Sequence, residues 1–173
     1  MQETVQDILS RRSVKKFKSD SVPQELIDKV IEAGLHAPSA LNHQGTIIIA
    51  VTQKKLRDAL SEDNRIIGKR DGDPFYGAPV VLLVLGDKNW PHRVYDGSLV
   101  LGNMLNTAHA LGLGACWIHR CREEFEMLKY QNLLKELGIS DEYEGIGHCV
   151  IGYSDMQITT KLECKANRVY YVR

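Results

Sequence analysis

Apolar residues recur at helical spacing in five separate stretches of the chain. Val5, Ile8 and Leu9 give the first example, and they predict a short amphipathic helix that ends at a run of basic residues. The five expected helices cover residues 5–9, 21–34, 54–60, 95–111 and 123–137. The helix over 95–111 is apolar around most of its circumference, so we expect it to be central or to lie at a subunit interface.

Short apolar runs between these helices predict strands. Four strands are expected, over residues 46–52, 80–85, 115–119 and 147–151. The run from Val80 to Leu85 is apolar throughout, which is typical of a strand that is covered on both faces. Residues 169–172 also look like a strand, one that could join a neighbour's sheet. Residues 61–77 mix charges, glycines and Pro74, so we expect a surface excursion there.

The order and number of these elements limit the fold classes that the chain can adopt. Helices and strands interleave, which indicates an α/β or α+β protein. The chain has 173 residues, enough for one domain with a sizeable core, so we expect a single domain over 1–173. Lysines and arginines number 22, as do aspartates and glutamates. This balance argues against a general nucleic-acid binder, because non-specific affinity for polyanions comes from excess positive charge.

The four cysteines, Cys116, Cys121, Cys149 and Cys164, form no CxxC pair, so we expect reduced thiols in a cytoplasmic protein. The polar N-terminus lacks the apolar core of a secretory signal. The longest apolar run, from Ala78 to Leu85, is too short to span a membrane.

The stretch from Arg11 to Lys18 carries five basic residues among eight. Arg11 and Arg12 offer planar, permanently charged groups that bind a phosphate with two hydrogen bonds each. Ser13 adds a hydroxyl donor and Lys15 a flexible charge. A polyphosphate, a nucleic acid or a single terminal phosphate would suit this stretch, and a surface turn without a ligand is the alternative.

Two further segments carry candidate binding groups. The loop from Ala37 to Gly45 offers Ser39, Asn42 and Gln44, whose side chains could hold the edge of a flat polar heterocycle. An ordinary capping and turn segment is the alternative for this loop.

The second segment follows the long helix. Gly112 and Gly114 allow a close approach of the backbone, and Trp117 can supply an aromatic wall. The backbone N–H groups of residues 118–120 could donate to a heteroaromatic nitrogen. Glycines that only end a helix are the alternative.

Several established motifs are absent from the sequence. Neither Gly112-Leu113-Gly114 nor Gly145-Ile146-Gly147 continues as a dinucleotide-binding GxGxxG motif. The sequence also has no phosphate-binding GxxxxGK, no GxSxG and no HExxH. His119 with Cys121, and His148 with Cys149, lack the partner spacing of a metal site, so we expect none. Cys116 is interpreted as a small buried thiol rather than a nucleophile.

Three segments in fixed order resemble the nitroreductase-like FMN-dependent oxidoreductases: RRSVKKF, APSALNHQ and ALGLGACWI. The closing NRVYYV resembles a short-chain branch of that family. The resemblance implies an α+β fold with a central mixed β-sheet of four to five strands wrapped by helices. It also implies a homodimer with FMN at the interface and a C-terminal tail that reaches the partner subunit.

The resemblance also implies roles for individual residues. Arg11, Arg12, Ser13 and Lys15 would hold the phosphate and ribityl chain of FMN, while Pro38, Ser39 and Asn42 would reach the isoalloxazine from the partner subunit. Ile118, His119 and Arg120 would present backbone N–H groups to the flavin N5. The remaining cofactor-binding residues are expected to be Gln44, Gly114, Trp117, Lys165 and Arg168. No catalytic side chain is assigned, because the flavin carries the chemistry.

The sequence departs from the family pattern at four places. Lys15 stands where arginine is usual, which keeps the charge but loses the planar fork. Gly45-Thr46 replaces the usual Pro-Trp, and His119-Arg120 occupies a position that glycines often hold. Cys164 stands where a basic phosphate ligand is expected, and Lys165 or Lys161 is expected to replace it.

The function that the resemblance implies is a ping-pong reductase. NAD(P)H would reduce the flavin and leave, and a flat electron-poor acceptor such as a nitroaromatic or a quinone would then take two electrons. The alternatives are a flavin-binding or regulatory dimer without turnover, and a reductive dehalogenase-like member of the same fold. No nucleic-acid or membrane partner is expected.

Overall fold

The computed structural model describes residues 3–157 and 162–173. Its regular elements, in chain order, are α1 (Glu3–Ser10), α2 (Gln24–Leu35), the 3-10 turn η1 (Ala40–Asn42), β1 (Thr46–Val51), α3 (Lys54–Gly68), β2 (Val80–Asp87), α4 (Arg93–Ala110), β3 (Gly114–Ile118), α5 (Cys121–Phe125), α6 (Leu128–Glu136) and β4 (Tyr143–Gly152). The four expected strands are therefore confirmed, with β4 four residues longer at its start than predicted.

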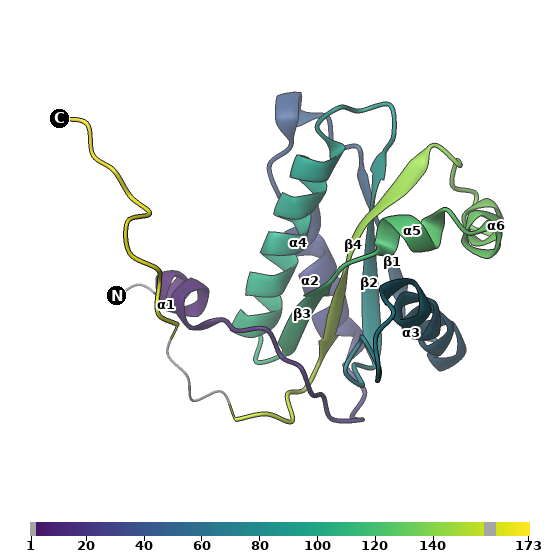
Figure 1. The fold of residues 1–173 in the computed structure, drawn as a ribbon, viewed down its shortest axis with the longest axis horizontal. Coiled ribbons are helices and arrows are strands. Elements are labelled where there is room, and N and C mark those ends of the chain that lie inside the picture. The colour runs from purple at the N-terminus through teal and green to yellow at the C-terminus, as the bar shows by residue number, and fades with distance from the viewer. Residues whose placement is uncertain (1–2, 158–161) are drawn as a thin grey trace.

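The four strands form one sheet in the order β1-β2-β4-β3, so β1 and β3 are its edges (Figure 1). All three strand pairs are antiparallel. The sheet is therefore antiparallel rather than mixed, and a parallel contact occurs outside the strands, in the isolated bridge between Ser13 and Ala115. This bridge lies where the basic stretch runs along the outside of β3.

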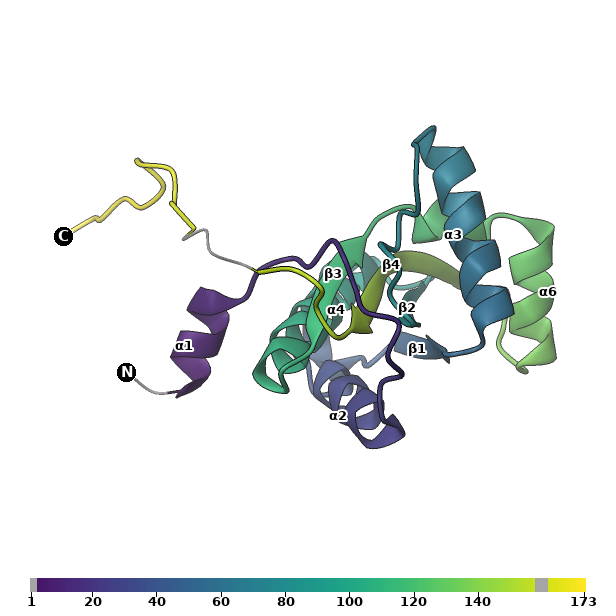
Figure 2. The ribbon, with the colours of Figure 1, turned by 90° about the horizontal axis from the view of Figure 1, so that it is seen from below.

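Helices cover both faces of the sheet, as Figures 1 and 2 show: α2 and α4 lie on one face, and α3, α5 and α6 on the other. Successive residues of β2 point to opposite faces, so Leu82 packs toward α4 while Leu83 packs toward α3. All residues from Val80 to Leu85 are buried, which confirms the expected strand with two covered faces. The long helix α4 is central, with Leu101 and Met104 fully buried.

The prediction of a surface excursion over residues 61–77 is wrong for its first half. Residues 61–68 continue α3, and they bury the polar side chains of Ser61, Asp63 and Asn64. Each side chain has a partner that is distant in sequence. Ser61 donates to Asp73, Tyr130 donates to Asp63, and Asn64 donates to the carbonyl of His119. Burial of polar groups is favourable when they are hydrogen-bonded in this way.

Two other expectations need correction. The helix predicted over 123–137 is two helices, because extended backbone at Met127 separates α5 from α6. The predicted strand over 169–172 is absent from the described tail, 162–173, which has no helix or strand and is exposed throughout. Figure 1 shows this tail on the same side of the molecule as α1. In the described part of the chain, no helix combines the length and the apolar character that crossing a membrane requires.

Candidate functional site

The basic stretch is bound to the edge strand β3. Ser13 and Ala115 form the parallel bridge, and the amide of Val14 donates to the carbonyl of Ala115 over 3.0 Å. Gly114 permits this contact, because a Cβ there would lie 2.7 Å from the Val14 side chain. The structure therefore brings together two segments, 11–15 and 114–118, that the sequence analysis considered separately.

The two arginines of this stretch have free hydrogen-bonding capacity. Arg12 donates through Nη1 to the carbonyls of Leu9, over 2.9 Å, and of Arg11, over 2.8 Å. Nη1 of Arg11 and Nε of Arg12 are buried and have no hydrogen-bond partner among the described residues. Buried guanidinium nitrogens without an acceptor are costly. An anion such as a phosphate would supply the missing acceptors.

Cys116 lies beneath this basic stretch. Burial raises the pKa of its thiol above the ordinary value of 9.0, whereas Ser13 and Lys15 lower it by less. The side chain is therefore a neutral thiol near pH 7, as the sequence analysis expected. Trp117, the next residue, is 36% exposed and packs against Gly147 on the opposite face of the sheet.

The backbone at the end of β3 is fixed by side chains from other elements. The carbonyl of Ile118 accepts a hydrogen bond from Nδ1 of His148, over 3.1 Å, and the carbonyl of His119 accepts one from Asn64, over 2.8 Å. A trans peptide directs its N–H away from its carbonyl. The N–H groups of His119 and Arg120 therefore point away from the buried partners of these carbonyls. Arg120 is in the left-handed region, with φ at 75°.

The loop over 37–45 also contains strained backbone. Leu41, Asn42 and Gln44 all have positive φ, between 52° and 54°. Such conformations are unfavourable for residues other than glycine, and they cluster at ligand sites where the surroundings enforce them. Within the loop, Ser39 Oγ accepts from the amide of Gln44 over 3.0 Å, and Asn42 Oδ1 accepts from Gln44 Nε2 over 2.9 Å.

Asp96, at the start of α4, anchors this loop. Its carboxylate is buried and accepts hydrogen bonds from the amide of Ala40, over 3.0 Å, and from the indole of Trp90, over 2.8 Å. Trp90 in turn stacks on His43, with ring centroids 4.1 Å apart. Two positions of the loop, Ala40 and His43, are thereby attached to the bonded pair of Asp96 and Trp90.

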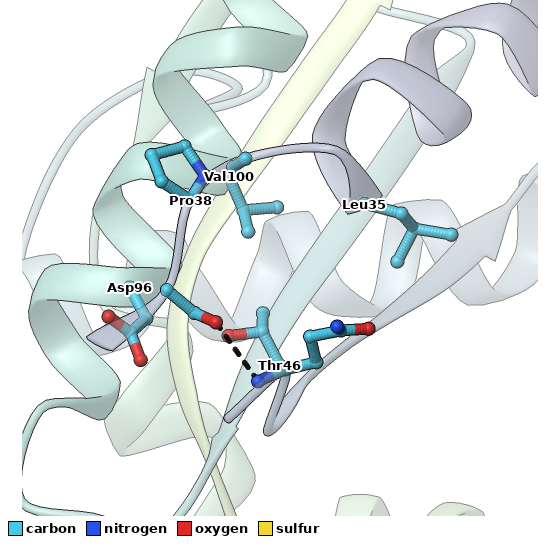
Figure 3. A pocket seen from close by; sticks show the side chains of 8 residues that line it. Leu35, Pro38, Thr46, Asp96 and Val100 are labelled. Atoms are coloured by element: carbon cyan, nitrogen blue, oxygen red, sulfur yellow. Dashed lines mark hydrogen bonds between the residues drawn. The ribbon is translucent and has the colours of Figure 1, made fainter. Parts of the chain in front are cut away.

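A small pocket of about 180 Å³ opens beside this loop (Figure 3). Its lining consists of Leu35, Ala37, Pro38, Ser39, Gln44, Thr46, Asp96 and Val100. Ligand pockets are typically about 300–1,000 Å³. The pocket that one chain forms here is smaller than this range.

The structure does not bring the loop and the basic stretch together within one chain. The loop precedes Thr46, which pairs with Gly86 on β2, whereas Ala115 pairs with Ile151 on β4. The two segments thus lie at opposite edges and opposite ends of the sheet. Lys165 and Arg168 lie in the exposed tail and line a hollow formed by residues 164–169. Lys161, the other basic candidate, is outside the described residues.

Two residues that position these segments were missed as site residues. Asp96 lies in the helix predicted over 95–111 but was not named as a site residue, and Asn64 fell in the segment predicted to be a surface excursion. The apolar surroundings of Asp96 in sequence were the available signal, because a buried carboxylate requires partners.

Comparison with known proteins decides the family. The model of the nitroreductase family matches residues 8–153. This chain belongs to the nitroreductase family. The resemblance carried by the three sequence segments is thus confirmed.

Two curated relatives illustrate the similarity of this nitroreductase-family chain. A Methanothermobacter thermautotrophicus protein, provisionally named an NADH dehydrogenase/NAD(P)H nitroreductase, is 32% identical over 122 residues, which are 66% of this chain and 60% of that protein. A Bacillus subtilis FMN reductase (NAD(P)H) is 34% identical over 90 residues, which are 51% of this chain and 34% of that protein. The matches therefore span less than two thirds of the length of either relative.

Solved structures confirm the α+β nitroreductase fold. A Bacteroides fragilis nitroreductase with bound FMN superposes with a TM-score of 0.90 at 21% identity, and the match covers 100% of both chains. An FMN-dependent nitroreductase from Clostridium difficile R20291 superposes with a TM-score of 0.80 at 28% identity, over 96% of this chain and 98% of that one.

Proposed function

We propose that this chain is an FMN-dependent oxidoreductase that uses NAD(P)H to reduce a flat, electron-poor acceptor such as a nitroaromatic or a quinone. The observation that carries the proposal is the pair of buried, unpartnered guanidinium nitrogens on Arg11 and Arg12, fixed against β3. The FMN named in the relatives carries one terminal phosphate, and this phosphate suits the two arginines.

When bound, FMN would supply two-electron chemistry, in which a hydride is taken from NAD(P)H and passed on to the acceptor after the nicotinamide has left. The chain's own residues would bind and orient the reactants. Arg11, Arg12, Ser13 and Lys15 would hold the phosphate and the ribityl chain. Lys165 or Arg168 of the tail would add positive charge near the same phosphate.

The end of β3 would orient the flavin ring. The side chains of His148 and Asn64 hold the carbonyls of Ile118 and His119, so the adjacent N–H groups face outward in a fixed direction. One of these N–H groups would donate to flavin N5. A backbone donor tolerates the unusual His119-Arg120 pair, because the side chains do not take part. Gly114 and Trp117 would lie beside the ring.

We infer that the site is completed by a second copy of the chain. The loop with Pro38, Ser39, Asn42 and Gln44 lies at the opposite edge and the opposite end of the sheet from the basic stretch of its own chain. Leu41, at the loop tip, is 91% exposed, and α1 buries none of its residues. A homodimer would cover these apolar groups and place the loop of one subunit over the flavin of the other. The cytoplasmic location expected from the sequence stays a prediction.

Steady-state oxidation of NAD(P)H tests the enzymatic part of the proposal. The purified protein, supplied with FMN, is expected to oxidise NADH or NADPH when a nitroaromatic or a quinone is present. FMN that binds stoichiometrically without acceptor-dependent oxidation would favour the regulatory dimer instead. Turnover with halogenated aromatics alone, with halide released, would favour a dehalogenase.

A further inference from the structure

A second group of reactive side chains lies between α5 and β4, next to the end of β3. Cys121 and Glu124 come from α5, and His148 comes from β4. All three residues are 0% exposed. The thiol sulfur, a carboxylate oxygen and an imidazole nitrogen lie within 4.8 Å of one another.

The local backbone explains this arrangement. Arg120, with φ at 75°, turns the chain sharply from β3 into α5. Residues three apart on a helix share a face, so Cys121 and Glu124 point in the same direction. Gly145 lets β4 pack directly against the start of α5, because a Cβ there would lie 2.2 Å from the carbonyl oxygen of Cys121. His148 then faces α5 from the same strand.

The polar atoms at the centre of the cluster lack regular hydrogen bonds. Both carboxylate oxygens of Glu124 and Nε2 of His148 are buried, and none has a hydrogen-bond partner among the described residues. Oε2 of Glu124 and Nε2 of His148 form a buried ion pair over 2.5 Å, although its geometry is not that of a hydrogen bond. A buried carboxylate is costly unless a positive group pairs with it, so Glu124 requires either His148 or a cation at this place.

The orientation of the imidazole directs its Nε2 toward Cys121 and Glu124. Nδ1 of His148 lies 3.1 Å from the carbonyl oxygen of Ile118, and a carbonyl can only accept. Nδ1 therefore carries a proton, and Nε2 is the ring nitrogen that faces Cys121 and Glu124. A histidine that donates its other N–H to a backbone carbonyl is the usual arrangement around a protein metal ion.

We propose that Cys121, Glu124 and His148 bind a structural Zn²⁺ ion. A thiolate, an imidazole and a carboxylate are zinc ligands, and a carboxylate that binds through both oxygens completes four donor atoms. Two ligands of one tetrahedral zinc ion lie about 3.3 Å apart. The Glu124 carboxylate must therefore withdraw slightly from His148 when the ion enters. Complete burial of the ligands leaves no place for a substrate.

The sequence predicted no metal site, because that prediction considered only residues that are close in the chain, such as His148 with Cys149. Cys149 points to the opposite face of the sheet, into the core around α4. The proposed ligands are instead joined by the packing of α5 on β4. An ion there would brace the end of β3, because His148 also holds the carbonyl of Ile118.

The test measures metal content of the full-length protein. The protein is stripped with a chelator, incubated with Zn²⁺ alone, dialysed and analysed by mass spectrometry, and about one Zn²⁺ per chain is expected. Co²⁺ alone should give a thiolate-to-metal charge-transfer band. Cys121→Ser should abolish this band and lower Zn²⁺ content at least about tenfold, while Cys149→Ala and Glu123→Gln should retain both. Glu123 is the exposed neighbour of the proposed ligand.

The wild-type protein alone can overturn the proposal, even if a variant fails to fold. Chelator-treated protein that takes up neither Zn²⁺ nor Co²⁺ would mean that the three side chains form a metal-free buried cluster. Equal Zn²⁺ binding by the wild type and Cys121→Ser would place the ion elsewhere. None of these measurements depends on FMN or on turnover, so the proposed function and the zinc site are tested separately.

Discussion

The backbone amide of Val14 donates a hydrogen bond to the carbonyl of Ala115 over 3.0 Å. This bond fixes the basic residues 11–15 against the edge of the sheet, although α1 before them buries none of its residues. A charged segment held in this way loses little further conformational entropy when it binds a ligand. The proposed phosphate site is thus part of the folded body rather than of a free terminus.

Replacing both arginines with alanine should separate cofactor binding from folding. A hydrogen bond to a charged group contributes about 1.5–3 kcal/mol, so R11A/R12A is expected to weaken FMN binding about 100-fold or more. Folding should persist, because the side chain of Arg12 donates its hydrogen bonds to the carbonyls of nearby residues in the chain, Leu9 and Arg11. Quenching of FMN fluorescence gives the affinity, and circular dichroism reports the fold.

Lys16→Ala is the matched control for the double variant. Lys16 is basic and lies in the same stretch, but it is paired with Asp155 over 2.6 Å. Its replacement should leave FMN affinity within about fivefold of the wild type, because the Lys16 ammonium is engaged by Asp155 and an exposed charge contributes about 0–1 kcal/mol. A double variant that retains stoichiometric FMN would refute the phosphate assignment.

Mixed dimers test whether each flavin site uses two subunits. One subunit carries R11A/R12A and the other carries S39A/N42A. If the loop of one chain serves the basic stretch of the other, one of the two sites in the mixed dimer has every residue intact. FMN binding and NAD(P)H oxidation should then recover to about half of the wild-type level per dimer.

The parent variants provide the control for this experiment, because each homodimer has two defective sites. Recovery requires that the two chains exchange, which native mass spectrometry of differently tagged chains can verify. Verified mixed dimers without recovery would mean that the loop and the basic stretch of one chain serve the same site.

Asp96→Asn should destabilise the protein by about 1–3 kcal/mol. Asp96 accepts hydrogen bonds from the Ala40 amide and the Trp90 indole, and in the variant one of these two donors would face the N–H₂ group of the asparagine. Urea unfolding at pH 7 measures this change. Asp28→Asn is the control, since Asp28 is exposed and bonds Gln24 one helical turn away. Equal unfolding midpoints for the two variants would contradict the anchoring role of Asp96.

Asp73 should make stability depend on pH in the acid range. Burial raises the pKa of Asp73, but hydrogen bonds from Ser61, from Arg57 and from two backbone amides lower it below the ordinary 3.8. The unfolded chain therefore takes up the proton first. The contribution of Asp73 is complete above pH 3.8 and is lost as the pH falls through its lower folded value.

The corresponding variant is Asp73→Asn. It should be less stable than the wild type at pH 7, and the difference between them should shrink at pH 3. Urea midpoints at pH 7, 5, 4 and 3 measure this, with Asp20→Asn, an exposed position, as the control. A difference that stays constant over this range would show that Asp73 titrates alike in the folded and unfolded chains.

The apolar pattern predicted the strands well because each strand contains a run of apolar residues, which in β2 is unbroken from Val80 to Leu85. It failed for residues 61–68, where α3 continues with buried polar side chains. Ser61 and Asn64 are buried because Asp73 and the carbonyl of His119 accept their hydrogen bonds. Partners of this kind are fixed by tertiary structure, so local periodicity cannot reveal them.

The candidate site shows the same limit. The residue types in 11–15, 37–45 and 114–120 indicated binding groups, because arginine forks, amides and glycines have specific chemistry. Their relative placement was not predictable from spacing, since it depends on the Ser13–Ala115 bridge and on the strand order β1-β2-β4-β3. Asp96 escaped notice because its two partners, Ala40 and Trp90, come from separate loops.

The visible absorption spectrum of the purified protein, supplied with FMN and freed of excess, tests the central claim most directly. The account predicts a yellow protein with about one FMN per chain, which bleaches when NADH or NADPH is added without oxygen. The coenzyme that bleaches it identifies the electron donor. A protein that stays colourless after FMN is supplied would contradict the account and leave the basic stretch without a ligand.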